Sequence, residues 1–429
     1  MISFLIVLAI VISIFLGYKT KINTGFFAIG FAYLIGCFGL NLGASKVIAM
    51  WPIKIFFVIF SVSLFYNFPM TNGTLEKLSQ HMLYKTRKIP HLLPFAIFFC
   101  ATFIAGLGAG YFTVLAFFGP LTLILCEKTG LSKLTGALAV NYGSLAGANF
   151  MTSASGIIFR GLIENAGYQN SFSHATAIFV STIIIPIVVL SLLILKDKNK
   201  MLKNKSLEID VPEEFNETQK TTLKLICAMV FIVLIFPILN TVFPGNPIIK
   251  FINSKLDIGL IAILFTIVAF LMKLGKEKEI IAKVPWNTLI MICGVGMLIS
   301  VAIKAGTIEI LSSWIGTNIP RFLIPIILCS VGGIMSSFSS TLGVVAPALF
   351  PIIPVISETT GLNPTVLFVA VIVGAQATSI SPFSSGGSLI LGSATEEERN
   401  GLFGELLFKG TSLALISSII FSTILSIVM

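Results

Sequence analysis

Six apolar runs, each long enough to cross a bilayer as a helix, limit what this chain can fold into. A spanning helix needs about 20 predominantly apolar residues, rising about 1.5 Å per residue. The runs occupy residues 2–18, 23–43, 52–71, 222–243, 256–272 and 285–304. With 56% hydrophobic residues, 11% charged residues and a mean hydropathy of +1.00, the chain cannot cover the surface of a soluble domain. We therefore expect an all-α polytopic protein whose surroundings are the lipid bilayer.

The formal net charge of +10 does not indicate a nucleic-acid partner. Its lysines and arginines lie in short loops between apolar runs, where they act as topology signals. They place the lysine-rich linker 196–220 in the cytoplasm of a multi-pass protein of the cell (inner) membrane. The six cysteines lie in or beside apolar runs without the spacing of a metal site, and we predict no bound cofactor.

Four further apolar tracts have weak centres. The tracts 92–128 and 321–358 are too long for one span and have Gly- or Ser-rich middles, which predicts a re-entrant hairpin in each. The tracts 132–165 and 364–394 are interrupted midway and are predicted to be broken helices. Non-helical backbone at membrane depth is tolerated only where protein buries it or where it lines a wet cavity. These interruptions are therefore the expected binding region of a transporter.

The two halves of the chain resemble each other. Thr129–Gly156 aligns without gaps on Thr360–Gly387, with Thr-Gly-Leu at the start of both segments. Trp51–Ser79 aligns in the same way on Val284–Ser312. Two collinear ungapped matches that share their glycines indicate an internal duplication.

The duplication predicts two structural repeats, residues 1–195 and 221–429, joined by the linker. Each repeat is expected to contain about five transmembrane helices, one re-entrant hairpin and one broken helix. Five spans is an odd number, so the second repeat is expected to be inverted in the membrane.

The residue types at the interruptions favour ion and carboxylate binding over catalysis. No Asp or Glu falls within the middle of a predicted span. Membrane proton relays commonly use such residues, so Na⁺ as the coupling ion is favoured over H⁺. An intramembrane enzyme would need an acid or base, and we expect no enzyme. The interruptions instead supply hydroxyls and helix ends, whose N–H groups attract carboxylates and whose carbonyls attract Na⁺.

The candidate site residues all lie at these interruptions. The predicted substrate-binding residues are Ser339, Ser340, Thr341, Ser381, Pro382, Ser384, Ser385, Gly108, Gly110, Asn149, Thr152 and Ser153. The predicted Na⁺ ligands are Ser337, Ser339, Thr341, Thr378 and Ser379. Small polar residues are also common at packed helix contacts, so a packing role stays open for any single serine. For Arg160, the only cation near an interruption, an interfacial anchor is favoured over a counter-charge for an anion.

Three segments carry a family resemblance: Asn72-Gly73-Thr74, Pro120 and Gly143-Ser144-Leu145-Ala146-Gly147-Ala148-Asn149-Phe150. With the duplicated hairpin and broken helix, they resemble the MatC-type dicarboxylate (malonate) carriers. These carriers belong to the ion-transporter superfamily, which includes the divalent-anion/sodium symporters. The similarity is best over residues 20–170 and is echoed in the second repeat. It implies a homodimeric elevator-type carrier that moves a small di- or tricarboxylate, often with Na⁺.

The resemblance also identifies candidate hairpin tips. In the sodium symporters the tips carry Ser-Asn-Thr, and the matching positions here are Ser339-Ser340-Thr341 and Gly108-Ala109-Gly110. We therefore expect a Na⁺-coupled symporter of a small organic anion, such as the dicarboxylates malonate, malate or succinate. The alternatives are a membrane subunit of a binding-protein-dependent tripartite carboxylate carrier and an H⁺-coupled carrier of another small anion.

Overall fold

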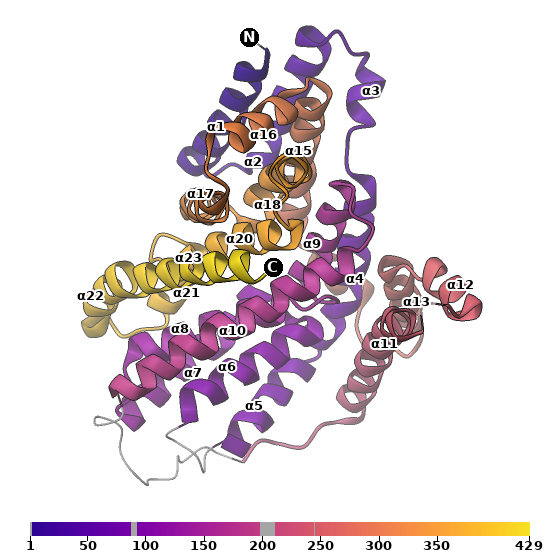
Figure 1. The fold of residues 1–429 in the computed structure, drawn as a ribbon. Helices are drawn as coiled ribbons and strands as arrows, with labels where there is room; N and C mark the ends of the chain where they lie inside the picture. The colour runs from indigo at the N-terminus through magenta and orange to yellow at the C-terminus, as the bar shows by residue number, and fades with distance from the viewer. Residues whose placement is uncertain (1, 87–91, 198–210, 244) are drawn as a thin grey trace.

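The regular secondary structure of the described residues is helical throughout. The computed structural model describes residues 2–86, 92–197, 211–243 and 245–429 (Figure 1). In this part of the chain, nine helices are long and apolar enough to cross a membrane, or up to 11 if each of two bent helix pairs is one span. The expected all-α polytopic fold is confirmed.

The helices of the two halves follow in a similar order. The first half contains α1 (Ile2–Thr20), α2 (Thr24–Tyr33), η1 (Leu34–Gly39), α3 (Ala44–Ile48), α4 (Ile53–Thr71), α5 (Thr74–Thr86), α6 (Leu93–Ile104), η3 (Ala105–Ala109), α7 (Tyr111–Thr129), α8 (Lys133–Ala148), α9 (Ala154–Asn165) and α10 (Ser171–Asp197). The second half contains α11 (Glu217–Val242), α12 (Pro247–Lys255), α13 (Ile258–Leu271), α14 (Glu277–Ala282), α15 (Trp286–Lys304), α16 (Thr307–Asn318), η4 (Arg321–Leu323), α17 (Ile324–Phe338), η5 (Thr341–Val345), α18 (Ala346–Leu349), η6 (Phe350–Ile352), α19 (Ile353–Thr360), α20 (Pro364–Ala377), η7 (Thr378–Ile380), α21 (Ser385–Gly392), α22 (Glu396–Gly404), η8 (Glu405–Gly410) and α23 (Thr411–Val428).

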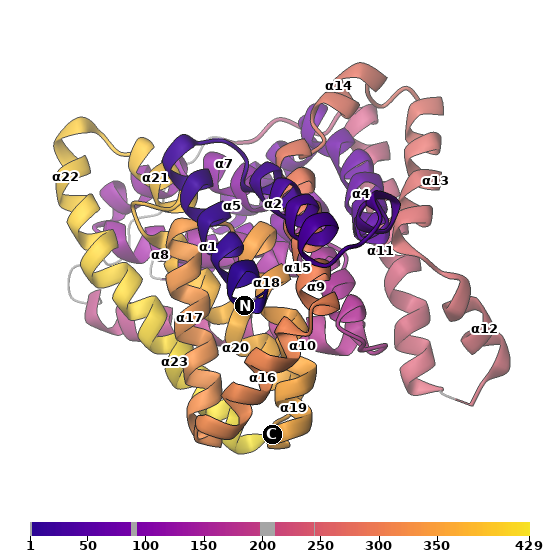
Figure 2. The same ribbon diagram turned by 90° about the horizontal axis from the view of Figure 1, so that it is seen from above.

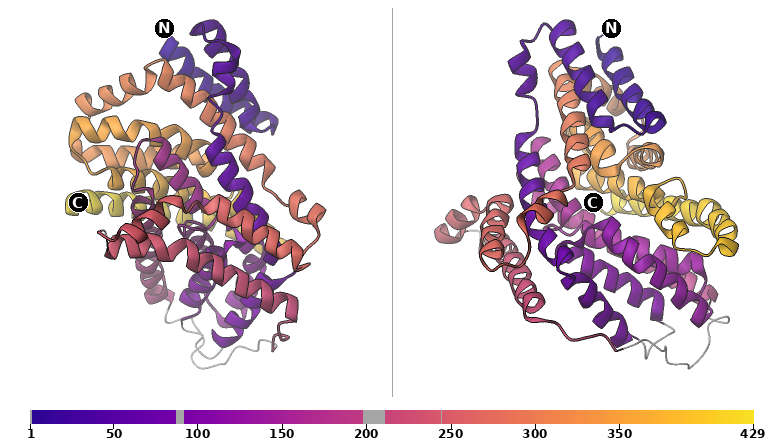
Figure 3. Two further views of the ribbon diagram at one scale, coloured as in Figure 1. Left: turned by 90° about the vertical axis from the view of Figure 1, so that its right-hand side faces the viewer. Right: turned by 180° about the vertical axis from the view of Figure 1, so that it is seen from behind.

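The helices pack in two groups. One group, called here the frame, consists of α1, α2, α4, α11, α13 and α15, which are linked by mutual contacts. Within it, α11 and α13 lie beside α4 at one edge of the molecule (Figures 2 and 3). The second group, called the site bundle, consists of α6–α10 and α17–α23. The two groups meet where α4 contacts η3 and α9, and where α15 contacts η5 and α18.

Repeated sequence positions adopt repeated backbone conformations. Pro52 and Pro285 are the residues immediately before α4 and α15. Gly130 and Gly361 end α7 and α19 with left-handed φ values of 71° and 67°. These matches agree with the internal duplication. The repeat boundaries and the inverted orientation stay predictions, and residues 198–210 of the linker lie outside the described residues.

Two glycines let helices of the site bundle approach closely. At Gly143 in α8, a Cβ atom would overlap the carbonyl oxygen of Phe98 in α6. At the equivalent Gly374 in α20, a Cβ would overlap the carbonyl oxygen of Cys329 in α17. Because small residues let helix backbones approach in membranes, this pair explains one identity of the duplication. Each broken helix thus packs directly against the first arm of the preceding hairpin tract.

We expect the single substitutions Gly143→Ala and Gly374→Ala to lower the free energy of unfolding by roughly 1–3 kcal/mol, because each added methyl group must push two helices apart. Gly30→Ala is the matched control, since a Cβ at Gly30 in α2 meets no atom of the described residues within 4 Å. Thermal unfolding of the purified protein in detergent measures the difference. Equal melting temperatures for all three variants would contradict the close packing described here.

Candidate functional site

Both predicted broken helices are interrupted in the structure. In the first half, α8 ends at Ala148 and α9 begins at Ala154. In the second half, α20 runs into the 3₁₀ turn η7, and α21 begins at Ser385. Asn149, Thr152 and Ser153, between α8 and α9, are fully buried. Residues 149–153 and 378–384 are called here break 1 and break 2.

The hairpin tract of the first half is also interrupted, and glycine makes this possible. Gly108 has a φ of 98° and Gly110 a φ of 74°, in the region that L side chains rarely adopt. Gly108 lies against the ring of Tyr66 in α4, because a Cβ at Gly108 would overlap that ring. This interruption therefore contacts a frame helix, and the re-entrant hairpin itself stays a prediction.

The matching interruption in the second half is built from serine and threonine. Ser339 is extended, with φ −145° and ψ −179°, and ends α17. The Ser340 hydroxyl accepts a hydrogen bond from the Gly343 N–H at 3.1 Å, capping η5. Ser336 and Thr341 share a hydrogen bond of 2.8 Å across the interruption. The predicted tip residues thus lie at a real break, and several of their hydroxyls are used to close it.

Break 1 is held by contacts with the first hairpin tract and with α4. The Ser153 hydroxyl donates to the carbonyl of Ala105 in η3 at 2.7 Å. The Tyr66 hydroxyl donates to the carbonyl of Thr152 at 3.3 Å. Within the described residues, the buried Thr152 hydroxyl has no hydrogen-bond partner. A buried hydroxyl without a partner costs free energy, so Thr152 is a candidate ligand for a bound solute.

Two polar links join the two halves at the breaks. Asn149 and Gln376 donate to each other's side-chain oxygens, at 2.8 and 2.9 Å. The Tyr111 hydroxyl at the start of α7 donates to Asn141 Oδ1 at 2.7 Å, and Asn141 Nδ2 donates to Ser379 Oγ at 2.9 Å. Break 1, break 2 and the start of α7 therefore lie together.

The helix N-termini at these breaks differ between the halves. In the second half, Ser384 accepts from the Gly387 N–H at 3.1 Å and caps α21, as Ser340 caps η5. In the first half, the described residues provide no side-chain cap for α9 at Ser153 or for α7 at Gly110. The Ser153 hydroxyl donates to the Ala105 carbonyl instead, and Gly110 has no side chain that could cap α7. Within the described part of the chain, the starts of α7 and α9 are thus left without a side-chain cap.

The structure brings some predicted cation ligands together. The hydroxyls of Ser337 and Thr378 both donate to the carbonyl of Gly333, at 3.0 and 3.3 Å. Ser379 instead bonds to Asn141, on the side facing α8. The Ser339 hydroxyl donates to the Met335 carbonyl of its own helix at 2.7 Å. The predicted cation-ligand set is therefore divided among separate contacts.

The remaining predicted residues of break 2 differ in their exposure. Ser381 and Pro382 are buried, and the Ser381 hydroxyl accepts from the Phe383 N–H at 3.4 Å. Ser384 is half-buried, whereas Ser385 is exposed. Break 2 thus presents one face to the surroundings and packs its other face into the site bundle.

Sequence reasoning missed three residues that organise the site: Tyr66, Tyr111 and Asn141. Each lies outside the clusters of hydroxyls that the search favoured. The available signal was a single amide or phenol within a predicted span, where polar groups are rare and commonly bonded to another helix.

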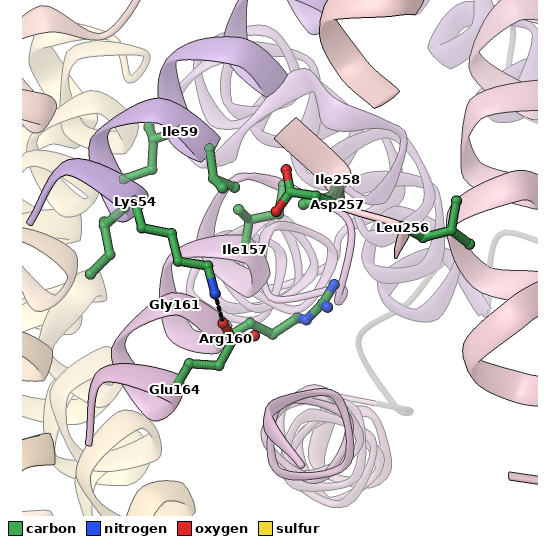
Figure 4. Close-up of a pocket in the computed structure, with 11 residues that line it drawn as sticks. Lys54, Ile59, Ile157, Arg160, Gly161, Glu164, Leu256, Asp257 and Ile258 are labelled. Carbon is green, nitrogen blue, oxygen red and sulfur yellow. Dashed lines mark hydrogen bonds and ion pairs between the residues drawn. The ribbon is translucent and has the colours of Figure 1, made fainter. Parts of the chain in front are cut away.

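Arg160 lies in a separate pocket of about 130 Å³ between α4, α9 and the start of α13 (Figure 4). Lys54 Nζ pairs with Glu164 Oε2 at 2.5 Å, and Asp257 lies on the facing side of the pocket. The Arg160 guanidinium carbon is 5.6 Å from the centre of the Phe172 ring. Two cations face two carboxylates here, so the pocket offers no net positive charge to an anion. The anchor interpretation of Arg160 fits this arrangement better than a counter-charge for cargo.

Two interrupted helices that meet inside an apolar multi-span bundle define the class of the protein: a membrane transporter. Residues 1–148 match the family model for the dicarboxylate carrier protein MatC N-terminus, and residues 249–429 match the citrate transporter model. These matches agree with the resemblance of the sequence to the MatC-type dicarboxylate carriers. Both family models describe transporters, and the long apolar helices indicate a multi-pass membrane protein.

Solved structures support the fold. The Alcanivorax borkumensis YdaH transporter superposes with a TM-score of 0.62 at 16% identity, covering 91% of this chain and 89% of that chain. Neisseria gonorrhoeae MtrF, described as illuminating a class of antimetabolite efflux pumps, gives a TM-score of 0.56 at 14% identity, covering 92% and 85%. Among curated proteins, none matches this sequence.

We expect Ser384→Ala to remove the cap of α21 and to lower the free energy of unfolding by about 1 kcal/mol. Ser388→Ala is the control in the same helix, because the exposed Ser388 hydroxyl donates only to the Ser385 carbonyl, at 3.1 Å. Chemical denaturation in detergent compares the two variants. If Ser388→Ala destabilised the protein as much as Ser384→Ala, the capping role of Ser384 would be wrong.

Proposed function

We propose that this chain is a secondary active transporter of a small organic anion, with a dicarboxylate such as malonate, malate or succinate as cargo and Na⁺ as the coupling ion. The observation that carries the proposal is the arrangement at break 1. There, the start of α9 has no side-chain cap among the described residues and follows Thr152, whose buried hydroxyl has no partner among them. The start of α7, also without a side-chain cap among these residues, follows η3, which Ser153 contacts. The alternative is that H⁺ is the coupling ion, and the transport test below distinguishes the two ions.

The anion part of the proposal follows from helix electrostatics. The N-terminus of a helix carries about half an elementary positive charge, and its first N–H groups have no partners within the helix. The bond from Ser153 to Ala105 holds the start of α9 against η3, the segment that leads into α7. We propose that each of the two uncapped N-termini binds one carboxylate of the solute. The exposed Ala154 and Thr113 leave both helix starts open.

The cation part follows from the carbonyls and hydroxyls of the second half. Na⁺ binds hard oxygen ligands, which unwound backbone and helix C-termini supply. Ser337 and Thr378 converge on the Gly333 carbonyl, at the C-terminal ends of α17 and α20. The Thr378 hydroxyl also donates to the Ala375 carbonyl at 3.2 Å. The two hydroxyl oxygens and the Gly333 carbonyl oxygen are the three oxygens that we propose for one ion. We therefore place the Na⁺ site at Ser337 and Thr378, with Ser339 and Thr341 next along the chain.

The division into frame and site bundle suggests how the cargo would cross. The site bundle contains both breaks, and it meets the frame through α4 and α15. We propose that the site bundle moves as a unit against these two helices, in an elevator-type cycle. The frame would then form the contact between the subunits of a homodimer.

We expect purified protein in proteoliposomes to take up labelled malonate, malate or succinate when a Na⁺ gradient is imposed, because cargo and ion occupy adjoining sites. Uptake should fall to background when K⁺ replaces Na⁺. Uptake driven only by a pH gradient would replace Na⁺ by H⁺ as the coupling ion. Absence of uptake of any small carboxylate under every gradient would reject the function.

We expect Thr152→Val to leave the empty protein as stable or make it slightly more stable, because it removes a buried hydroxyl that has no partner. The same change should weaken the binding of cargo or Na⁺, measured as the ligand-dependent rise in melting temperature and as the KM of uptake. Thr176→Val, in α10, is the control, because the Thr176 hydroxyl is occupied by the Phe172 carbonyl at 2.7 Å. Unchanged ligand response in Thr152→Val would remove Thr152 from the site.

A further inference from the structure

The two buried amides that join the interrupted helices have a role that a binding site alone does not explain. Asn149 is fully buried and Gln376 is 6% exposed. Asn149 Nδ2 donates to Gln376 Oε1 at 2.8 Å, and Gln376 Nε2 donates to Asn149 Oδ1 at 2.9 Å. Asn149 Nδ2 also lies 3.4 Å from the Thr182 hydroxyl of α10. The side-chain oxygen of each amide thus accepts a hydrogen bond from the other amide.

The pair occupies a particular place in the fold. Asn149 is the C-terminal cap residue of α8, and Gln376 lies in the last turn of α20. Break 1 begins at Asn149, and break 2 begins two residues after Gln376, at Thr378. The amide pair therefore ties together the last turns of both interrupted helices, immediately before the chain leaves helical geometry.

The pair does not follow from the internal duplication. In the ungapped alignment of the two halves, Asn149 corresponds to Ile380 and Gln376 corresponds to Leu145. If the duplication alone explained the pair, the two amides would stand at equivalent positions of the two halves. Each amide instead stands opposite an apolar equivalent, so the contact is a separate feature of this junction.

Stability alone is a weak reason for such a pair. A hydrogen bond between transmembrane helices contributes on the order of 1 kcal/mol, and two apolar side chains of similar shape would serve nearly as well. What an apolar contact lacks is direction. Two reciprocal hydrogen bonds fix the distance and the relative rotation of the side chains that form them.

We propose that Asn149 and Gln376 are positioning residues that hold the ends of α8 and α20 in one relative register, so that break 1 and break 2 form a single site. This inference rests on the proposed transport function. It reassigns Asn149, which the sequence suggested as a substrate ligand, because Gln376 occupies its amide. The cargo contacts then belong to Thr152 and to the N–H groups at the starts of α7 and α9.

The test compares four variants with the wild type in proteoliposomes. Asn149→Leu and Gln376→Leu each leave one buried amide unpaired. The double variant Asn149→Leu with Gln376→Leu removes both amides and restores apolar packing. The exchanged variant Asn149→Gln with Gln376→Asn keeps two reciprocal amides and the total side-chain length. Melting temperature, KM and Vmax are measured for each, with the Na⁺ dependence of uptake.

If the pair positions the site, the single variants lose both stability and uptake. The leucine pair recovers the melting temperature, while its Vmax/KM stays lower by roughly tenfold or more, since small displacements at a site have large effects on rate. The exchanged variant recovers uptake. Wild-type Vmax/KM in the leucine pair, or no recovery of uptake in a folded exchanged variant, would overturn the inference. Asn67→Leu is the control, because it removes a buried amide of the frame helix α4, which bonds to the Ile280 carbonyl of α14 at 3.0 Å. It should lower stability with KM unchanged.

The same experiment separates this inference from the proposed function. If the wild type itself shows no uptake of any carboxylate, the transport function fails. If the wild type is active and the leucine pair is equally active, only the positioning role fails.

Discussion

Backbone N–H and C=O groups cannot be left unpaired within a bilayer, and each helix interruption in this protein creates several such groups. The site bundle meets this constraint by burying most of break 1 and one face of break 2 between other helices. Close packing at Gly143 and Gly374 places the broken helices directly against their hairpin tracts. Polar contacts from Tyr66 and Ser153 then stabilise the freed backbone of the first break and its neighbour η3. Backbone that remains unpaired is consequently the part that a charged solute can use.

The sequence predicted those features that depend on neighbouring residues. Long apolar runs indicate spans, and hydroxyl- or glycine-rich interruptions indicate broken helices, because both signals are local. Gly143 and Gly374 could be found because the duplication marks them twice. The pair Asn149 and Gln376 could not be predicted, since its members lie 227 residues apart and at positions that the alignment does not relate. Only the packing of α8 against the second half determines that they meet.

Hydroxyl density was an incomplete guide to the site. It directed attention to the second half, where Ser340 and Ser384 turn out to cap η5 and α21. A serine hydroxyl can satisfy the backbone of its own chain or bind a ligand, and its sequence surroundings do not distinguish the two uses. In the first half, Gly110 and Ser153 leave the starts of α7 and α9 uncapped. The uncapped helix ends therefore lie where glycine stands in place of a hydroxyl residue, at Gly110, or where the hydroxyl bonds elsewhere, at Ser153.

Because equivalent helix starts are capped in one half and uncapped in the other, the two halves suit different ligands. The second half pairs its N–H groups with serines and gathers hydroxyls at the Gly333 carbonyl, which suits a cation. The first half leaves N–H groups open beside the Thr152 hydroxyl, which suits an anion. Opposite charges stabilise each other when they bind at adjoining sites, so each ligand would raise the affinity for the other. A duplicated scaffold whose two breaks have diverged in this way can couple an anion to a cation without a buried carboxylate.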